Sequence, residues 1–217
     1  MSAFLSDAKD FLPILVSGVW MTLAITLCSL LLSVILGFVW ALAGTSRFAI
    51  VHRASRLVVN TVRGIPILVQ LFYIYFVLPQ LGITLNAFLA GVVGLGLAYS
   101  VYQAENFRAG FSSVDRSLIE AAQSLGMPHR MIVRRLILPL AIRVILPPFG
   151  NTSIMLLKDS SIASTITVAE LTRQGQLLAV STFKNMTVYT LVALLYLAMS
   201  LPLSYLTRRL ERSFAAR

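Results

Sequence analysis

Long runs without a charged side chain alternate with short basic segments along this chain. The first run extends from Phe11 to Ser46, and the second extends from Gly64 to Ala104. A helix needs about 20 apolar residues to cross the hydrocarbon core of a bilayer. The first run therefore predicts one long transmembrane helix, and the second, about twice the length of one crossing, predicts two.

Turn-forming residues divide the second run. Pro79, Gly82 and Asn86 lie near its middle, where such residues mark a tight turn between helices. The five expected spans cover residues 11–46, 64–81, 86–104, 136–157 and 186–206. The pattern therefore predicts an all-α integral membrane protein, with five transmembrane helices in one domain over residues 1–217.

Basic residues predict the orientation. Arginines concentrate between the first and second spans, between the third and fourth spans, and in the C-terminal tail, whereas the turn between the second and third spans has none. Loops rich in Arg and Lys stay in the cytoplasm. An odd number of spans then places the N-terminus outside and the C-terminus inside, which puts every basic cluster in the cytoplasm.

Composition agrees with membrane insertion. Hydrophobic residues make up 58% of the 217 residues and charged residues only 12%, compared with about 25% charged in ordinary soluble domains. The net charge of +10 is accounted for by the topogenic arginines, so no nucleic-acid partner is expected. The lipid bilayer is the expected partner of the apolar surface.

A cleaved signal peptide is the alternative for the first run, since an Ala-x-Ala pattern begins at Ala41. Asp7, Lys9 and Asp10 do not make a clear positive region ahead of the run. The run is also longer than the apolar core of a signal peptide. We therefore interpret it as a membrane-spanning helix.

The sequence lacks the patterns of an enzyme. A P-loop requires Gly-Lys followed by Ser or Thr, but Lys9, Lys158 and Lys184 follow Ala, Leu and Phe. His52 and His129 lie far apart and the eight acidic residues are scattered, so no metal site or catalytic cluster is indicated. No enzyme is therefore expected, and no cofactor is expected to bind to this chain. A secondary transporter or channel subunit that needs no ATPase is one alternative for such a set of spans, although its inverted repeats are not found.

Residues 105–135 predict a folded cytoplasmic loop between the third and fourth spans. Ser117 and Glu120 have the spacing of a capping box, and Gly126 suits the left-handed residue that ends a short helix. Pro128 suits the first turn of a second helix leading into the fourth span. The two short helices form either a projecting knob or a connector lying on the membrane surface.

The same loop carries a spaced motif. Glu120-Ala-Ala is followed after three residues by Gly126, and after nine more by Leu136-Ile-Leu-Pro139. This pattern resembles the EAA loop of ATP-binding-cassette (ABC) importer permeases, although that family has Ile where Leu136 stands. Four flanking stretches resemble its polar-amino-acid branch: residues 63–72, 105–110, 123–127 and 151–161. The resemblance covers roughly residues 11 to 210.

The resemblance implies a type I ABC importer permease fold and a division of labour between subunits. In this family the EAA knob is a coupling helix that sits in a groove of a separate ATP-binding subunit, of which two copies hold ATP and Mg. Carried over to this sequence, the coupling positions are Glu120, Ala121, Ala122, Gly126, Leu138 and Pro139, the last two setting the re-entry into the membrane.

The resemblance also implies the other partners and the location. A second permease chain, identical or homologous, is expected to pair around the path. A periplasmic or extracellular amino-acid-binding protein is expected to deliver the substrate, which would be a polar or charged amino acid or an opine-like derivative. The expected location is the inner (plasma) membrane of a bacterium, as a multi-pass protein.

Polar residues near the end of the fourth expected span are the candidate substrate path. They follow Pro147-Pro148, which we expect to interrupt the helix, and transporter sites lie where helices break near the midplane. The candidates are Asn151, Lys158, Asp159, Ser160 and Ser161. Asp159 could accept from an ammonium group and the serines could donate to a carboxylate. Equally, Lys158 and Asp159 could mark the outer end of the span.

By the same topology, residues 162–184 face outwards. Glu170, Arg173 and Lys184 lie in this segment. A dock for the binding protein, a half-inserted gate and a solvated loop are all compatible with its sequence.

Overall fold

The computed structural model describes residues 2–215, and all regular secondary structure in that range is helical. The α-helices are α1 (Ser2–Gly44), α2 (Ala49–Gly64), α3 (Ile67–Phe72), α4 (Ala87–Ser112), α5 (Arg116–Ser124), α6 (His129–Ile132), α7 (Leu138–Asp159), α8 (Leu171–Thr182) and α9 (Asn185–Ala215). Two π-helical segments, Tyr73–Val77 and Val133–Ile137, follow α3 and α6, and two 3₁₀-helical segments, Leu78–Leu81 and Ser160–Ile166, lie before α4 and after α7. The expected all-α class is confirmed.

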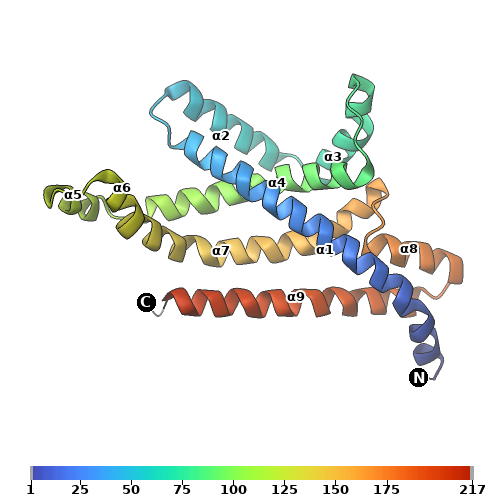
Figure 1. The fold of residues 1–217 in the computed structure, drawn as a ribbon. Helices are drawn as coiled ribbons and strands as arrows, with labels where there is room; N and C mark the ends of the chain where they lie inside the picture. Colours follow the sequence, from blue (N-terminus) through green and yellow to red (C-terminus); the bar gives the residue numbers. More distant parts are fainter. Residues whose placement is uncertain (1, 216–217) are drawn as a thin grey trace.

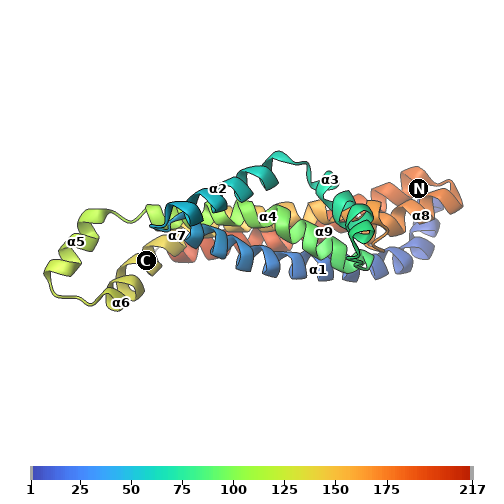
Figure 2. The ribbon, with the colours of Figure 1, turned by 90° about the horizontal axis from the view of Figure 1, so that it is seen from above.

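Four long helices, α1, α4, α7 and α9, form an elongated bundle (Figures 1 and 2). Helix α1 packs on α4, α4 packs on α7, and α7 packs on α9. The short helices α5 and α6 project from the end of the bundle where α9 finishes, whereas α8 and the start of α1 lie at the opposite end (Figure 1). The bundle therefore presents two different ends to possible partners.

Close approach of two backbones holds α1 against α4. A Cβ atom at Gly37 would lie 2.6 Å from Cβ of Gln103 and 2.8 Å from the carbonyl oxygen of Ser100. Small residues at helix contacts allow this approach, which supplies van der Waals contact where lipid removes the hydrophobic driving force. Leu95 and Tyr99 of α4 are also buried, and α4 contacts both α1 and α7, so α4 forms the centre of the bundle.

A sharp bend separates α2 from α3. The axes of the two helical segments differ by 101°, because Pro66 forces Ile65 into an extended conformation (φ −104°, ψ 129°). The bend frees backbone carbonyls, and Nε2 of Gln70 donates to two of them, Val62 and Ile65, at 2.8 Å each. The helix expected over residues 64–81 therefore starts after this break, and α2 ahead of it was not anticipated from the basic composition of that segment.

Among residues 2–215, three helices, α1, α4 and α9, are long and apolar enough to cross a membrane, and there are four if the bent pair α2–α3 counts as one interrupted span. The expected fourth span corresponds to α7, which has 22 residues and lies in the bundle between α4 and α9. Helix α4 continues to Ser112, beyond the expected end at residue 104, and α9 continues to Ala215.

The paired prolines do not break α7. Pro147 and Pro148 both lie inside a helix that continues to Asp159, which corrects the expected interruption. A proline removes one donor and crowds the preceding turn, but packing against neighbouring helices can retain the helix in a membrane bundle. Here α4 and α9 flank α7, and the chain leaves α-helical geometry only at Ser160.

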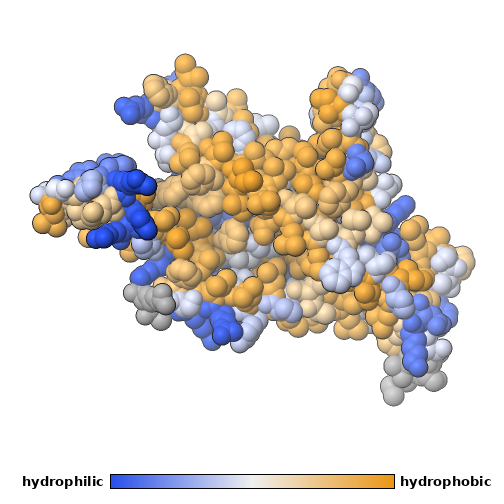
Figure 3. Space-filling view, viewed as in Figure 1, coloured by the Kyte–Doolittle hydropathy of each residue, from blue (hydrophilic) through white to orange (hydrophobic). Residues whose placement is uncertain are grey.

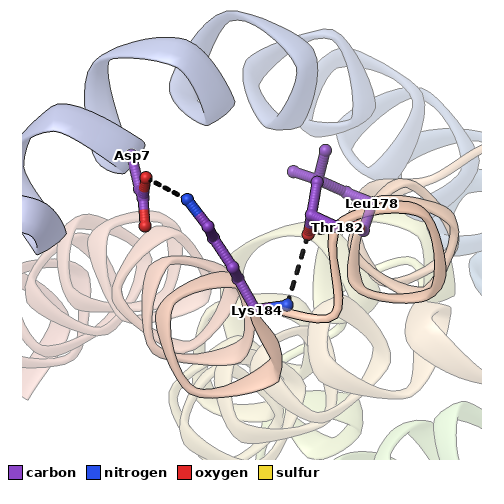
Figure 4. A network of polar contacts seen from close by, with 4 residues as sticks. All are labelled: Asp7, Leu178, Thr182 and Lys184. Atoms are coloured by element: carbon purple, nitrogen blue, oxygen red, sulfur yellow. Dashed lines mark hydrogen bonds and ion pairs between the residues drawn. The ribbon is translucent and has the colours of Figure 1, made fainter.

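Residues 162–184 are packed rather than solvated. Helix α8 contacts both α1 and α9, and Leu171 and Ala179 are buried on it. At its far end Nζ of Lys184 lies 2.6 Å from Oδ1 of Asp7, and the Lys184 amide donates to Oγ1 of Thr182 (Figure 4). The ion pair joins the first turns of α1 to the turn between α8 and α9, so the solvated-loop interpretation is wrong.

The surface divides in the same way as the fold. Apolar residues cover most of the visible face of the bundle, and hydrophilic residues gather on the projecting α5–α6 end and near the start of α1 (Figure 3). Large apolar side chains are exposed on the bundle helices, for example Leu31 on α1 and Leu201 on α9, at 64% and 58%. This distribution is the one expected of a protein whose sides face lipid.

Candidate functional site: the projecting hairpin and the polar groups of the bundle

Asp115 begins the projecting hairpin formed by α5 and α6. Its Oδ1 accepts from the backbone amide of Ser117 at 2.9 Å, and this bond holds the pKa of the Asp115 carboxyl below its usual value. The expected capping box from Ser117 to Glu120 is therefore wrong. Asp115 precedes the helix and takes the N-cap role, since Asp is as good a cap as Ser, and Ser117 lies inside the first turn.

Gly126 ends α5 as expected. Its φ is +73°, a left-handed conformation that costs a side chain more than it costs glycine. The amide of Gly126 donates to the Gln123 carbonyl at 2.9 Å, and the amide of Met127 donates to the Ala122 carbonyl at 3.1 Å. These two bonds form a Schellman motif, which fixes the angle at which the chain leaves α5.

The return to the bundle is continuous. Pro128 is the N-cap of α6, directly ahead of the first turn in which it was expected, and Ile132 in that helix is fully buried. The chain then passes through a π-helical segment into α7 without a loop. A force on the hairpin would therefore reach α7 through helical backbone.

The predicted coupling residues differ in exposure. Glu120, Ala121 and Gly126 are exposed on the hairpin, whereas Ala122 is 7% exposed and faces inwards. Leu138 and Pro139 are exposed in the first turn of α7. Three of the four predicted coupling residues in the hairpin are therefore accessible to a partner. The fourth, Ala122, packs inside the hairpin.

The predicted path residues do not converge on one point. Asp159 accepts a hydrogen bond of 2.6 Å from the hydroxyl of Tyr99 in α4, and Ser160 beside it is buried with its Oγ donating to the Leu157 carbonyl. Lys158 is exposed and Ser161 is half-buried.

Asn151 lies two turns away from Asp159 along α7. It is exposed and lines a separate cavity of about 270 Å³ between α7 and α9, together with Arg208 and Glu211. Only Asp159, Ser160 and Ser161 therefore remain together near the end of α7.

A second polar cluster between α4 and α7 was missed from the sequence. Asn106 donates to Oε1 of Gln103 and to Oγ1 of Thr152. Gln103 is fully buried, and within the described residues its Nε2 has no hydrogen-bond partner. The amide side chain of Gln103, inside the expected third span, was the available signal, because polar groups at that depth are costly and mark paths or partners.

Glu170 is the other group that sequence reasoning did not single out as a site. It is fully buried and caps α8, accepting from the amides of Thr172 and Arg173 at 2.8 and 2.7 Å. The Tyr196 hydroxyl of α9 donates to the same carboxylate at 2.8 Å. The available signal was a lone acid, since residues 162–184 contain no carboxylate besides Glu170. Glu170 thus ties α8 to α9, while the Leu171 amide bonds Oγ1 of Thr22 in α1 at 3.0 Å.

Known proteins are similar to this chain along nearly its whole length. A probable amino-acid ABC transporter permease protein, YckA of Bacillus subtilis, is 36% identical over 96% of this chain and 92% of its own length. The glutamine transport system permease protein GlnP of Escherichia coli is 37% identical over 93% of both chains. The crystal structure of an amino acid ABC transporter with histidines matches with a TM-score of 0.89 and 40% identity, covering 97% of this chain and 98% of the other.

A family model describes this group of proteins. It matches residues 33–216 and represents the binding-protein-dependent transport system inner membrane component. The match includes the projecting hairpin, α7 and α9, and the curated relatives are similar over the remaining N-terminal part as well. The chain therefore belongs to the family of inner membrane components of binding-protein-dependent transport systems, the permeases of ABC importers.

Proposed function

We propose that this chain is the permease subunit of an ABC importer that carries an amino acid. The observation that carries the proposal is the α5–α6 hairpin, which projects beyond the bundle with Glu120 and Ala121 exposed and is joined to α7 by continuous helix. The amino-acid permeases among the relatives support the substrate class. A polar or charged amino acid, or an opine-like derivative, is the proposed cargo.

The proposed mechanism uses the hairpin as a lever. Two ATPase subunits hold ATP and Mg²⁺ and receive the hairpins of two permease chains, identical or homologous. Closing of the ATPases moves the hairpins, and α7 transmits the movement to the bundle. Gly126 and the hydrogen bonds around it keep the hairpin in one shape, because a flexible hairpin would absorb the movement instead of passing it on.

The proposed topology places the hairpin and the C-terminus in the cytoplasm and the N-terminus outside. It counts α1, the α2–α3 pair, α4, α7 and α9 as five spans in the inner membrane. The opposite ends at which α5 and α8 lie support this arrangement. The end that carries α8 would then receive the amino-acid-binding protein, and α8, clamped by Glu170 and Thr22, would border the outer mouth of the path.

The proposed substrate path passes the end of α7. Asp159 is the acceptor for the substrate ammonium, and Ser160 and Ser161 border it. Tyr99 already donates to Asp159, so substrate would either add to this bond or replace it. Gln103 is a further candidate on the cytoplasmic side of Tyr99, since its Nε2 has no partner among the described residues and could donate to a carboxylate.

Co-purification from native membranes tests the proposal. A tag after Arg217 should retain an ATP-binding subunit with the wild type, and Glu120→Lys should deplete that subunit because a cation replaces the exposed acid of the hairpin. Gln80→Lys is the matched control, because Gln80 is exposed in the turn before α4, away from the hairpin. Absence of an ATPase from folded wild-type protein in mild detergent would favour the secondary transporter.

A further inference from the structure

The cleft between α1, α2 and α4 has a surplus of positive charge. It has a volume of about 260 Å³, and three guanidinium groups line it, those of Arg56, Arg63 and Arg108. The only acid among the lining residues is Glu105, which forms an ion pair with Arg108 one turn along α4. Arg56 and Arg63 have no carboxylate partner within the described residues, so the cleft is suited to an anion.

The positions of the two unpaired arginines follow from the helix period. Arg56, Asn60 and Arg63 recur at intervals of four and three residues on α2, which places them on one face, and all three line the cleft. The guanidinium of Arg63 also lies 5.9 Å from the centre of the Tyr102 ring of α4. One face of α2 therefore lines the cleft with polar and positively charged side chains.

Apolar surface borders the same cleft. Trp40, Ala41 and Val59 line it. Leu42 and Leu57, each next to a lining residue in the sequence, are 49% and 69% exposed. Tryptophan is typical of the membrane–water interface. An ion that fits only the arginines would leave this apolar border unused, whereas a phospholipid would place its phosphate among the guanidinium groups and its acyl chains along α1 and α2.

We propose that the cleft binds the headgroup phosphate of an anionic phospholipid. Basic pockets between helices on the cytoplasmic side of a membrane protein attract such headgroups, each Arg contributing about fivefold in affinity. The bound lipid would fill the space between α2 and α4 and fix α2 against the bundle. The inference rests on the proposed topology only for the choice of the cytoplasmic leaflet.

Native mass spectrometry of the purified importer in mild detergent tests the site. Wild-type protein titrated with dioleoylphosphatidylglycerol should retain this lipid about 25-fold more tightly than the double variant Arg56→Gln/Arg63→Gln. The matched control is Arg53→Gln, on the same helix and exposed but outside the cleft, and it should retain the lipid as the wild type does. The variant Arg56→Lys/Arg63→Lys keeps both positive charges, so it should retain the lipid nearly as tightly as the wild type does.

Three results would overturn the proposal. Equal lipid retention by the wild type and the double variant would show that Arg56 and Arg63 do not bind the lipid. Equal retention of dioleoylphosphatidylcholine would show that charge is not recognised. Displacement of the lipid by inorganic phosphate at millimolar concentration would identify a free-anion site instead. Because lipid retention needs neither ATP nor transport, a failure here leaves the proposed importer function unaffected.

Discussion

The hydroxyl of Tyr99 in α4 donates a 2.6 Å hydrogen bond to Oδ2 of Asp159, the last residue of α7. The bond joins two helices of the bundle at the point where α7 gives way to a 3₁₀ segment. A carboxylate at such a point, beside a ring that is 1% exposed, is held in one orientation. Its role in transport can therefore be separated from its role in structure by two variants.

Asp159→Asn should impair uptake more than it impairs folding. Asparagine can still accept from Tyr99, but it cannot balance the charge of a substrate ammonium, so KM for ATP-driven uptake should rise by roughly 10-fold or more. Tyr99→Phe is the control, because it removes the interhelical bond and leaves the carboxylate. A similar KM for Asp159→Asn and wild type in proteoliposomes would exclude Asp159 from the substrate site.

Glu170→Ala should lower the thermal stability of the detergent-solubilised protein. The variant removes the cap of α8 and the carboxylate that accepts from the half-buried hydroxyl of Tyr196, and the combined loss should be about 2–4 kcal/mol. Asp10→Asn, at an exposed acid near the start of α1, should unfold at the wild-type temperature. Equal melting of Glu170→Ala and the wild type would show that this network does not hold α8.

Gly37→Ala should weaken the packing of α1 on α4. The new Cβ would lie 2.6 Å from Cβ of Gln103 and 2.8 Å from a backbone oxygen, and overpacking of this kind costs about 1–3 kcal/mol. Gly64→Ala is the matched control, since nothing lies within 4 Å of a Cβ there. The unfolding temperatures of the two variants can be compared by heating followed by size-exclusion chromatography. Equal unfolding temperatures for Gly37→Ala and the wild type would show that the close contact at Gly37 is not needed for the packing of α1 on α4.

Gly126→Arg should abolish ATP-driven uptake while the protein remains in the membrane. The space around Gly126 is open, so the penalty comes from its φ of +73°, which costs an L-residue about 1–2 kcal/mol. Gly126→Asn is the control, because asparagine adopts this conformation more readily than other side chains. Wild-type uptake by Gly126→Arg would remove this residue from the coupling surface.

The N-cap of α5 should weaken when the pH is lowered into the acidic range. The Ser117 amide lowers the pKa of Asp115 in the folded protein, so the carboxylate contributes stability above its unfolded pKa, and this contribution is lost as pH falls through the folded pKa. Hydrogen exchange at the Ser117 amide should be slow at neutral pH and should speed up in Asp115→Ala but not in Asp115→Asn, which keeps an acceptor. Equal exchange in all three proteins would rule out the cap.

The sequence predicted features that depend on local chemistry. The long apolar runs predicted α1, α4 and α9, and the glycine elbow at Gly126 was predicted because its φ is a property of that residue and its turn. The resemblance of the EAA loop led to the right family because the motif is local and spaced. These features need no knowledge of what packs against them.

Other features depended on neighbours that a sequence does not display. Pro147 and Pro148 indicated a break in α7, but α4 and α9 hold the helix intact. Glu170 was read as part of an outward segment of uncertain fold, because its partner Tyr196 lies 26 residues away on α9. The sequence indicated one site that contains Asn151 and Asp159. In the structure Asn151 lines a cavity between α7 and α9, whereas Asp159 accepts a hydrogen bond from Tyr99 of α4.

The contact between the hairpin and an ATPase is the central claim, and photo-crosslinking tests it directly. Replacement of the only cysteine by Cys28→Ser allows a benzophenone maleimide to be attached at Ala121→Cys, with Ser181→Cys at the opposite end of the bundle as the comparison site. We predict that illumination of native membranes links Ala121→Cys, and not Ser181→Cys, to a polypeptide that contains a P-loop. Absence of that product from Ala121→Cys, with the labelled protein folded, would contradict the account.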